Sequence, residues 1–288
     1  MKTIPTKIFL LSCILAVLSS AQATDMYWGG GIADVADNTT LPTNVTLFAG
    51  TWNSATKNWA STNTPGVYGS FVNGSMVDLG QVTFTTDAAV SAITNQADAS
   101  LSGLMLYAGA SAGSNQKVYL TATSPRTLTL TGNSFLLNIL GTDNNRGLQI
   151  ETNVYLAGSA PLTSSGLSGR FIIKSNSTNY TGNVSLRNSN FVIDSSSGSS
   201  GWGSLAGVPR WNIRSQLLNH GNTYPRLYVY RPVASAFDQL KDNGTIALSY
   251  GYFYYKGLDH ATSPSSETIG KLLLEPYGVL DLGAIGNG

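Results

Sequence analysis

Cysteine is almost missing from this chain, and its scarcity excludes several kinds of chemistry. The only cysteine among the 288 residues is Cys13, which lies in an N-terminal segment that we expect to be removed. The mature chain then has no disulfide, no thiol chemistry and no cysteine-based zinc site. Its stability must come from an extended hydrogen-bonded core instead.

Charge is scarce as well. Charged residues make up 11% of the sequence, with 16 Lys and Arg against 15 Asp and Glu. Lys2 and Lys7 fall in the N-terminal segment, so the mature chain carries a net charge of 14 − 15 = −1. Such a chain has no long-range field to hold phosphate backbones, and we expect no nucleic-acid partner. The hydrophobic content of 42% is enough to build a core, which excludes wholesale disorder.

Long apolar runs are missing too, except at the start of the chain. A basic start (residues 1–7), an apolar run (residues 8–18) and an A-x-A site ending at Ala23 form the pattern of a secretory signal peptide. The apolar run is shorter than the roughly 20 residues of a transmembrane helix, and no second run follows. We therefore predict a signal peptide at residues 1–23, cleavage after Ala23, a secreted or cell-surface protein, and no membrane-spanning segment in the mature chain. A lipoprotein site at Cys13 is disfavoured because the apolar run continues past it.

Helical periodicity is nearly absent, apart from one short helix expected at residues 233–241. Elsewhere, short alternating strands are separated by turn residues. They lie at residues 127–131, 148–150, 171–173, 184–186, 191–193 and 227–230. Because each is too short to stand alone, they need stacked neighbours, and we predict an all-β fold.

An internal spacing suggests how the strands stack. Comparable strands open at Leu128, Leu148, Phe171 and Phe191, in steps of 20, 23 and 20 residues. A step near 20 is typical of one coil of a β-solenoid, in which each coil buries apolar residues against its neighbours. A β-sandwich shows similar alternation, so periodicity leaves both folds open. Gly and Asn at the corners favour the solenoid, because tight corners call for positive φ.

Composition divides the mature chain into two regions. Residues 24–125 are richer in Ala and aromatics, and we predict a β-rich N-terminal cap that keeps the end of the stack from pairing with other chains. Residues 126–288 form the predicted solenoid repeat region. A strand at residues 278–282 comes just before the last residues and shows no cap, so we expect an open edge and a chain that is truncated or continues.

Three sets of motifs carry a resemblance to a known family. Residues 168–175 (SGRFIIKS) and 179–186 (NYTGNVSL) are two strands around a polar turn with an N-x-Y-x-G-type element. Paired strands recur late in the chain, and a tryptophan pair, Trp52 and Trp59, lies near the mature N-terminus. The late strands are residues 267–274 (ETIGKLLL) and 278–283 (GVLDLG).

On these motifs the chain resembles the autotransporter-associated β-strand repeat proteins, a family of bacterial exported proteins. The resemblance implies a right-handed parallel β-helix displayed at or beyond the outer membrane. The family has no shared catalytic residues, so none is carried over. We expect Trp52 and Trp59 to be residues of the N-terminal aromatic cap.

Catalytic constellations are not visible in the sequence. The acids are not spaced to share one strand face, except across neighbouring coils, so no acid pair of the kind used on polysaccharides is predicted. His220 and His260 stand alone and give no metal-ligand spacing. Gly29-Gly30-Gly31 is followed by no Lys-Ser/Thr pair or helix and is not a phosphate loop. We expect no catalytic residue, no cofactor and no metal.

One stretch (LSYGYFYYK) is rich in tyrosine. In a strand, Tyr250, Tyr252 and Tyr254 would point one way, while Phe253 and Tyr255 would point the other. An exposed tyrosine row stacks on sugar rings, whereas a self-packed row is a ladder that joins the coils. We favour the ladder, and keep Tyr250, Tyr252 and Tyr254 as candidates for ligand binding.

These features predict an exported, non-enzymatic β-solenoid that acts as a surface-displayed scaffold or adhesive, passenger-like protein. Its partners would be glycans, cell-surface components or matrix. The alternative is a secreted β-helix that binds or cleaves polysaccharide, which a cluster of acids near an aromatic groove would favour. A third possibility is a fragment with no independent role.

Overall fold

The computed structural model describes residues 24–31, 34–43, 48–64, 66–82, 90–108, 117–141, 147–166, 169–195, 203–215, 224–231, 238–258 and 266–285. The predicted signal peptide, His220 and His260 lie outside these residues. No helix among the described residues is long and apolar enough to cross a membrane.

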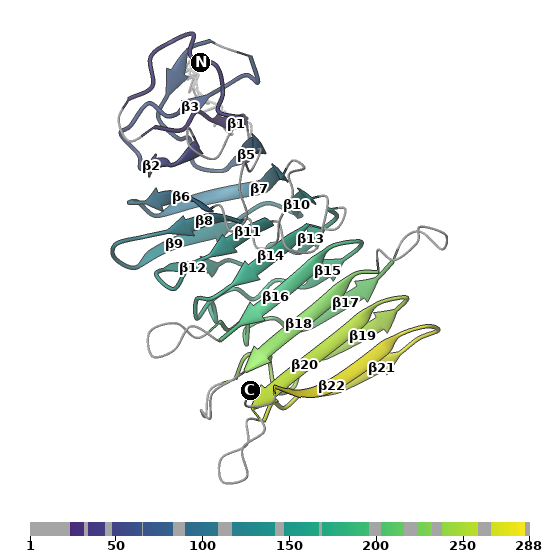
Figure 1. Ribbon diagram of the computed structural model, residues 1–288. Helices are drawn as coiled ribbons and strands as arrows, with labels where there is room; N and C mark the ends of the chain where they lie inside the picture. Colours follow the sequence, from purple (N-terminus) through teal and green to yellow (C-terminus); the bar gives the residue numbers. More distant parts are fainter. Residues whose placement is uncertain are drawn as a thin grey trace, which may run out of the picture.

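Two long β-sheets form the molecule (Figure 1). The 13 strands of sheet A are β1 (Asp25–Trp28), β3 (Trp59–Ala60), β4 (Tyr68–Gly69), β5 (Ser75–Val82), β7 (Ala99–Ala108), β9 (Arg126–Leu130), β10 (Phe135–Gly141), β12 (Val154–Ala157), β13 (Leu162–Ser164), β15 (Val184–Leu186), β17 (Arg210–Arg214), β19 (Thr245–Ser249) and β21 (Lys271–Leu274). The nine strands of sheet B are β2 (Gly50–Trp52), β6 (Val90–Asn95), β8 (Lys117–Thr121), β11 (Gly147–Ile150), β14 (Arg170–Ile173), β16 (Asn190–Asp194), β18 (Arg226–Arg231), β20 (Tyr252–Leu258) and β22 (Val279–Ile285). The prediction of an all-β protein is confirmed.

The pairing within both sheets is parallel almost throughout. Among the described strands, only the β1–β3 and β3–β4 pairs are antiparallel. From β13 onward the chain alternates between the sheets, with odd-numbered strands in sheet A and even-numbered strands in sheet B. This arrangement is compatible with the predicted β-solenoid, and it does not fit the antiparallel sheets of a β-sandwich.

Side chains that point between the sheets form the core. The strand β18 shows why, because its burial alternates and its Leu227 and Val229 point inward. Parallel register then stacks equivalent residues of sheet B into one buried column. This column contains Leu148, Phe171, Phe191, Leu227 and Phe253.

The predicted repeat is correct for three of its four strands. Leu148, Phe171 and Phe191 are in register, and the Phe171 and Phe191 rings lie 5.1 Å apart between centroids. Leu128 is the exception, because it lies in sheet A on β9 opposite Leu156. Spacing along the chain does not say which sheet a strand joins, and here β9 and β10 both enter sheet A before β11 enters sheet B.

The N-x-Y-x-G-type element at residues 179–182 forms a corner between two strands, and its tyrosine holds that corner in place. Tyr180 is fully buried, and its hydroxyl donates a 2.9 Å hydrogen bond to the Ala160 carbonyl. Burial raises the pKa of Tyr180, so the phenol stays a donor. Gly182 has to be glycine, because a Cβ there would lie 2.3 Å from the same carbonyl oxygen. The Thr181 amide donates to the Gly158 carbonyl at 2.8 Å, so the corner joins consecutive coils.

The tryptophan pair belongs to a buried aromatic cluster near the start of sheets A and B. The Trp59 ring lies 4.9–5.1 Å from the rings of Trp28, Trp52 and Phe71. Trp28, Trp52 and Trp59 are each 1% exposed. These residues come from three different strands, β1, β2 and β3, and from the loop before β5, so the cluster fastens the antiparallel strands to the parallel stack.

The predicted short helix is wrong in the part that the structure describes. Residues 238–241 have no helical conformation, and residues 233–237 lie outside the described residues. The Gln239 and Leu240 amides donate to the carboxylate of Glu267 instead of to a carbonyl four residues earlier. A long-range polar contact therefore outweighs the local helical pattern.

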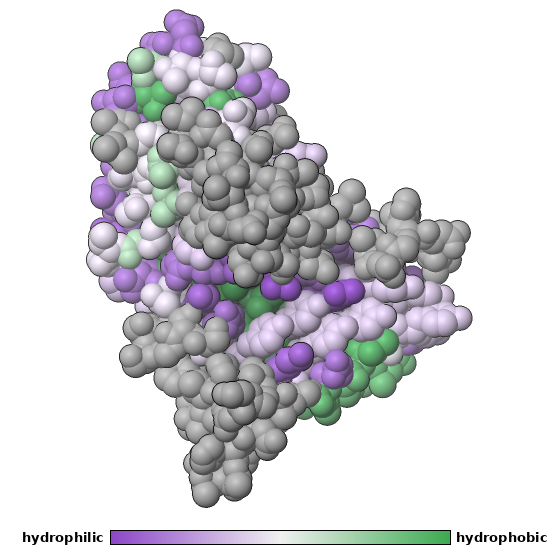
Figure 2. All heavy atoms as spheres, in the orientation of Figure 1, coloured by the Kyte–Doolittle hydropathy of each residue, from purple (hydrophilic) through white to green (hydrophobic). Residues whose placement is uncertain are grey.

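The strands at the other end of the molecule leave apolar side chains in solvent. The strands β21 and β22 are the last of their sheets, and each pairs on one side only among the described strands. Leu274 is 58% and Leu282 is 68% exposed, and Figure 2 shows hydrophobic surface in this part of the molecule.

Candidate functional site

The outer face of sheet B carries a row of tyrosines. The parallel pairing of β18 with β20 places Tyr228 opposite Tyr254, and the two rings stack 4.7 Å apart at 11°. Tyr252 and Tyr254 stack at 5.7 Å along β20, and Tyr228 and Tyr230 stack at 5.9 Å along β18. We call Tyr228, Tyr230, Tyr252 and Tyr254 the tyrosine face.

This face is partly open to solvent. All four side chains are half-buried, because each lies on its neighbours and leaves its outer surface uncovered. Figure 2 shows moderately polar side chains, in pale purple, spread over the position of β18 and β20. Alternation along β20 has the predicted sense, since Phe253 is buried in the core on the other side.

Two arginines frame the tyrosine face. The guanidinium of Arg226 lies 5.6 Å from the centre of the Tyr252 ring and donates a 3.2 Å hydrogen bond to the Tyr228 hydroxyl. The guanidinium of Arg170, on β14, lies 5.7 Å from the centre of the Tyr228 ring. Such cation–π contacts hold the rings in place. The arginines therefore make the face more rigid than a row of free tyrosines.

Tyr250 does not belong to this face. It lies in the corner between β19 and β20 with a φ of 50°, and its ring packs against Tyr277 at 4.7 Å. The sequence grouped it with Tyr252 and Tyr254 on the assumption of one continuous strand. The left-handed turn at Tyr250 breaks that strand and turns the side chain toward the next corner.

Two phenols of this face, those of Tyr230 and Tyr254, have a raised pKa and keep their protons at neutral pH. Burial raises the pKa of Tyr254, and the neighbouring Tyr228 raises it further. Burial also raises the pKa of Tyr230. The hydroxyls of these two residues can therefore donate and accept hydrogen bonds. Since the rings of the face stack on one another, a sugar would contact the outer ring surface that the neighbours leave uncovered.

Acidic residues do not gather beside the tyrosines. Among the described residues, no three His, Cys, Asp or Glu side chains are placed to hold a metal ion. Two carboxylates are paired with this face on the strands that flank it: Asp281 lies opposite Tyr254, and Asp194 lies opposite Tyr230. On sheet A, Asp25 and Asp78 share one face, and burial raises the pKa of Asp78. The Asp78 carboxylate accepts the Gly80 amide at 2.6 Å inside an irregular strand, which is a local structural role.

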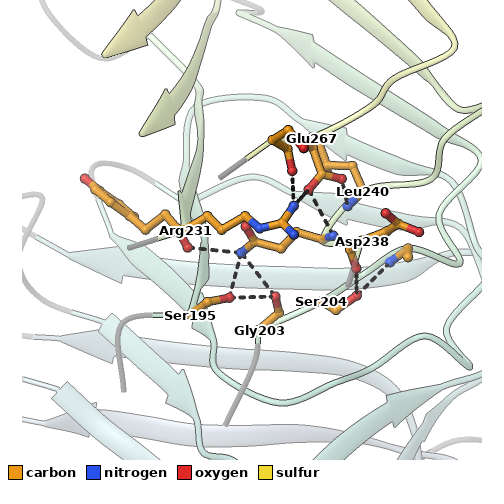
Figure 3. A network of polar contacts seen from close by, with 11 residues as sticks. Ser195, Gly203, Ser204, Arg231, Asp238, Leu240 and Glu267 are labelled. Atoms are coloured by element: carbon orange, nitrogen blue, oxygen red, sulfur yellow. Dashed lines mark hydrogen bonds and ion pairs between the residues drawn. The ribbon is translucent and has the colours of Figure 1, made fainter. Parts of the chain in front are cut away.

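A buried ion pair lies at the end of β18 (Figure 3). The Arg231 Nη1 atom lies 3.2 Å from Glu267 Oε2 and also donates to the Ser266 carbonyl. The Glu267 carboxylate accepts the Leu240 amide at 2.7 Å and the Gln239 amide at 3.2 Å. Side-chain exposure is 3% for Arg231 and 4% for Glu267, so water is nearly excluded.

The same network reaches the preceding coil. The Gln239 side chain donates to Ser195 Oγ at 2.8 Å and to the carbonyls of Tyr230 and Gly203 at 3.1 and 3.2 Å. A buried carboxyl with a raised pKa is often catalytic. Here its oxygens already have partners from three residues, so the geometry favours a role in joining coils.

The stability of the folded chain should depend on pH through Glu267. Burial raises the pKa of its carboxyl from 4.5 to about 7. Between these values the folded state keeps a proton that the unfolded state has lost, so this contribution to stability is complete below about pH 4.5 and falls as the pH rises to about 7. Urea unfolding across this pH range should show that the free energy of unfolding falls with rising pH in wild type and that Glu267→Gln lacks this fall. If the stability of wild type relative to Glu267→Gln rises with pH instead, the prediction is wrong.

Half of the tyrosine face, Tyr252 and Tyr254, was predictable from the sequence. Tyr228 and Tyr230 were expected only as part of an ordinary strand, and nothing in the sequence singled out Arg226 or Arg170. The available signal was the alternation R-L-Y-V-Y-R, which repeats the aromatic spacing of β20. It becomes visible only once the two strands are in register.

Comparison with known proteins adds no relative. No family model, no curated protein and no solved structure matches the chain. Any function must therefore be argued from the site itself.

Proposed function

We propose that this chain is an exported, non-enzymatic, right-handed parallel β-helix that acts as a surface-displayed scaffold or adhesive protein. It binds glycans through the tyrosine face of sheet B. The observation that carries the proposal is the stacked and half-exposed set of tyrosines on two adjacent strands, held by Arg226.

The β-helix part of the proposal is supported by the strand order. From β13 onward the strands alternate between two parallel sheets, as expected when each coil contributes one strand to each sheet. Crossovers between parallel strands of one sheet are right-handed in nearly all proteins, which supports the handedness. Export is supported by the three-part pattern of residues 1–23.

Glycan binding is supported by the chemistry of the face. Sugar rings have apolar surfaces that stack on aromatic rings and hydroxyl edges that hydrogen-bond to phenols. Tyr228 and Tyr254 stack across neighbouring strands, so a ligand lying across β18 and β20 would meet both rings. Because Arg170 and Arg226 restrain the rings, little side-chain entropy is lost on binding.

The alternative is an enzyme that cleaves polysaccharide at the same face. Glycoside hydrolysis normally needs two carboxyl groups about 5–10 Å apart. Two described carboxylates are paired with the tyrosine face across neighbouring strands of sheet B, Asp194 opposite Tyr230 and Asp281 opposite Tyr254. These two acids come from strands on opposite sides of the face, so the binding role is favoured.

The proposal predicts retention on neutral polysaccharide. The mature chain is mixed with insoluble cellulose, chitin, mannan and xylan, and the bound fraction is measured after centrifugation. We expect retention on at least one of them and a loss of affinity of about tenfold in Tyr228→Ala and Tyr254→Ala, which corresponds to about 1.4 kcal/mol. Tyr254→Phe should bind nearly as well, because it keeps the stacking surface.

The matched control is Tyr155→Ala, which removes a half-buried tyrosine from β12 on sheet A. It should leave the affinity unchanged, and circular dichroism should show that every variant is folded. Retention on none of the four polysaccharides, or equal losses in Tyr155→Ala and Tyr254→Ala, would overturn the proposal.

A further inference from the structure

A groove on the outer face of sheet A is the strongest feature that the tyrosine face does not include. Its volume is about 520 Å³, and it lies across β15, β17 and β19. The floor is low because small side chains occupy it, namely Ser185, Ala247 and Ser249. Longer side chains surround these small ones, and this difference in side-chain length forms the groove.

Three arginines supply those long side chains. Arg210 and Arg214 are the outward-pointing ends of β17, and Arg187 follows β15. Leu186 pairs with Ile213, and the residues that follow them, Arg187 and Arg214, both line the groove at this end of the two neighbouring strands. All three arginines are exposed.

These cations lack counterions in the described part of the chain. No described acid forms an ion pair with them, and the hydrogen bond made by Arg210 goes to the neutral Asn212 at 2.7 Å. Glu275 is the one acid among the described residues that line the groove, so the described lining carries 3 − 1 = +2 charges. Glu275 follows Leu274, which pairs with Leu248, so it is two strands away from Arg214. The chain as a whole is nearly neutral, so the positive charge of this groove is a property of this one surface.

We propose that this groove binds an acidic polysaccharide, with the carboxylates of the polymer paired to Arg187, Arg210 and Arg214. A guanidinium binds a carboxylate through two parallel hydrogen bonds, and several arginines that line one groove receive charges that repeat along a polymer. Ser185, Asn212 and Ser249 supply partners for sugar hydroxyls. No described residue of the lining is aromatic, so this part of the groove offers no surface on which the bases of single-stranded nucleic acids could stack.

This site is separate from the tyrosine face, which lies on the other sheet. The two can therefore be tested independently. Calorimetric titration of the mature chain with sodium alginate at low ionic strength should show binding that weakens as salt is added. The double variant Arg187→Gln/Arg214→Gln should lose about tenfold or more in affinity, because each charge-assisted pair contributes strongly. Tyr228→Ala should bind alginate as wild type does.

Two further variants separate the groove from overall charge. Lys271→Gln removes a positive charge from β21 on the same sheet but outside the groove lining, and should change affinity less than about twofold. Glu275→Gln removes the one negative charge in the lining and should strengthen binding. Circular dichroism confirms folding, which the exposed positions are expected to preserve.

Several results would overturn the proposal. One is no binding of alginate, and another is an equal loss in Lys271→Gln and in the double arginine variant. Equal binding of neutral dextran would exclude charge recognition, and tighter binding of dextran sulfate would make the ligand a sulfated polymer. Binding of inorganic phosphate with the same dependence on the arginines would indicate a small-anion site instead.

Discussion

Replacing Arg231 by alanine is expected to lower the free energy of unfolding by about 3–5 kcal/mol at pH 8. At this pH the Glu267 carboxyl is ionised, because its pKa is about 7. The substitution removes the cation and leaves a carboxylate whose side chain is only 4% exposed. The amides of Gln239 and Leu240 remain its only other described donors. An unpaired buried charge costs more than the original pair contributed. Urea unfolding followed by circular dichroism measures the loss.

The loss should depend on pH in a way that a simple packing defect does not. At pH 5 the carboxyl of Glu267 holds its proton in the folded state, so Arg231→Ala should cost clearly less than at pH 8. The matched control is Arg187→Ala, an exposed arginine without an ion pair to a described residue, which should change stability by less than about 0.5 kcal/mol. An equal loss at both pH values would show that Arg231 acts by packing rather than by charge.

The fold was predictable where a property of the chain repeats locally. Alternation of apolar and polar residues identified the strands, and the step of 20 residues placed Phe191 over Phe171. The column continues to Leu227 and Phe253 after steps of 227 − 191 = 36 and 253 − 227 = 26 residues. The repeat disappears from the sequence there because the connections lengthen, while the strands themselves stay in register.

The candidate site was less predictable, because it depends on register. Tyr252 and Tyr254 alternate along one strand, which a sequence displays directly. Tyr228 meets Tyr254 only through the pairing of β18 with β20, and Arg187 and Arg214 line one groove only through the pairing of β15 with β17. Both surfaces arise between strands that are far apart in the sequence. A single sequence does not contain that information unless the lengths of the connections are known.

Replacing Trp59 by alanine should have an effect as large as that of Arg231→Ala, about 3–5 kcal/mol. The Trp59 ring is 1% exposed and touches three other aromatic rings within 5.1 Å. Its removal leaves a large cavity where the antiparallel strands β1 and β3 meet the stack, and it also removes edge-to-face contacts. Urea unfolding should show a lower midpoint for this variant.

Phenylalanine substitutions separate the ring from its hydrogen bond. The Trp59 Nε1 atom has no hydrogen-bond partner among the described residues, whereas Trp28 Nε1 donates to the Phe48 carbonyl at 2.8 Å. Trp28→Phe should therefore cost about 1–3 kcal/mol more than Trp59→Phe, because it leaves a buried carbonyl without its donor. If the two phenylalanine variants are equally stable, the hydrogen bond of Trp28 contributes nothing. If Trp59→Phe is as damaging as Trp59→Ala, the cluster requires the full indole ring, and its shape rather than its aromatic character holds this end of the stack together.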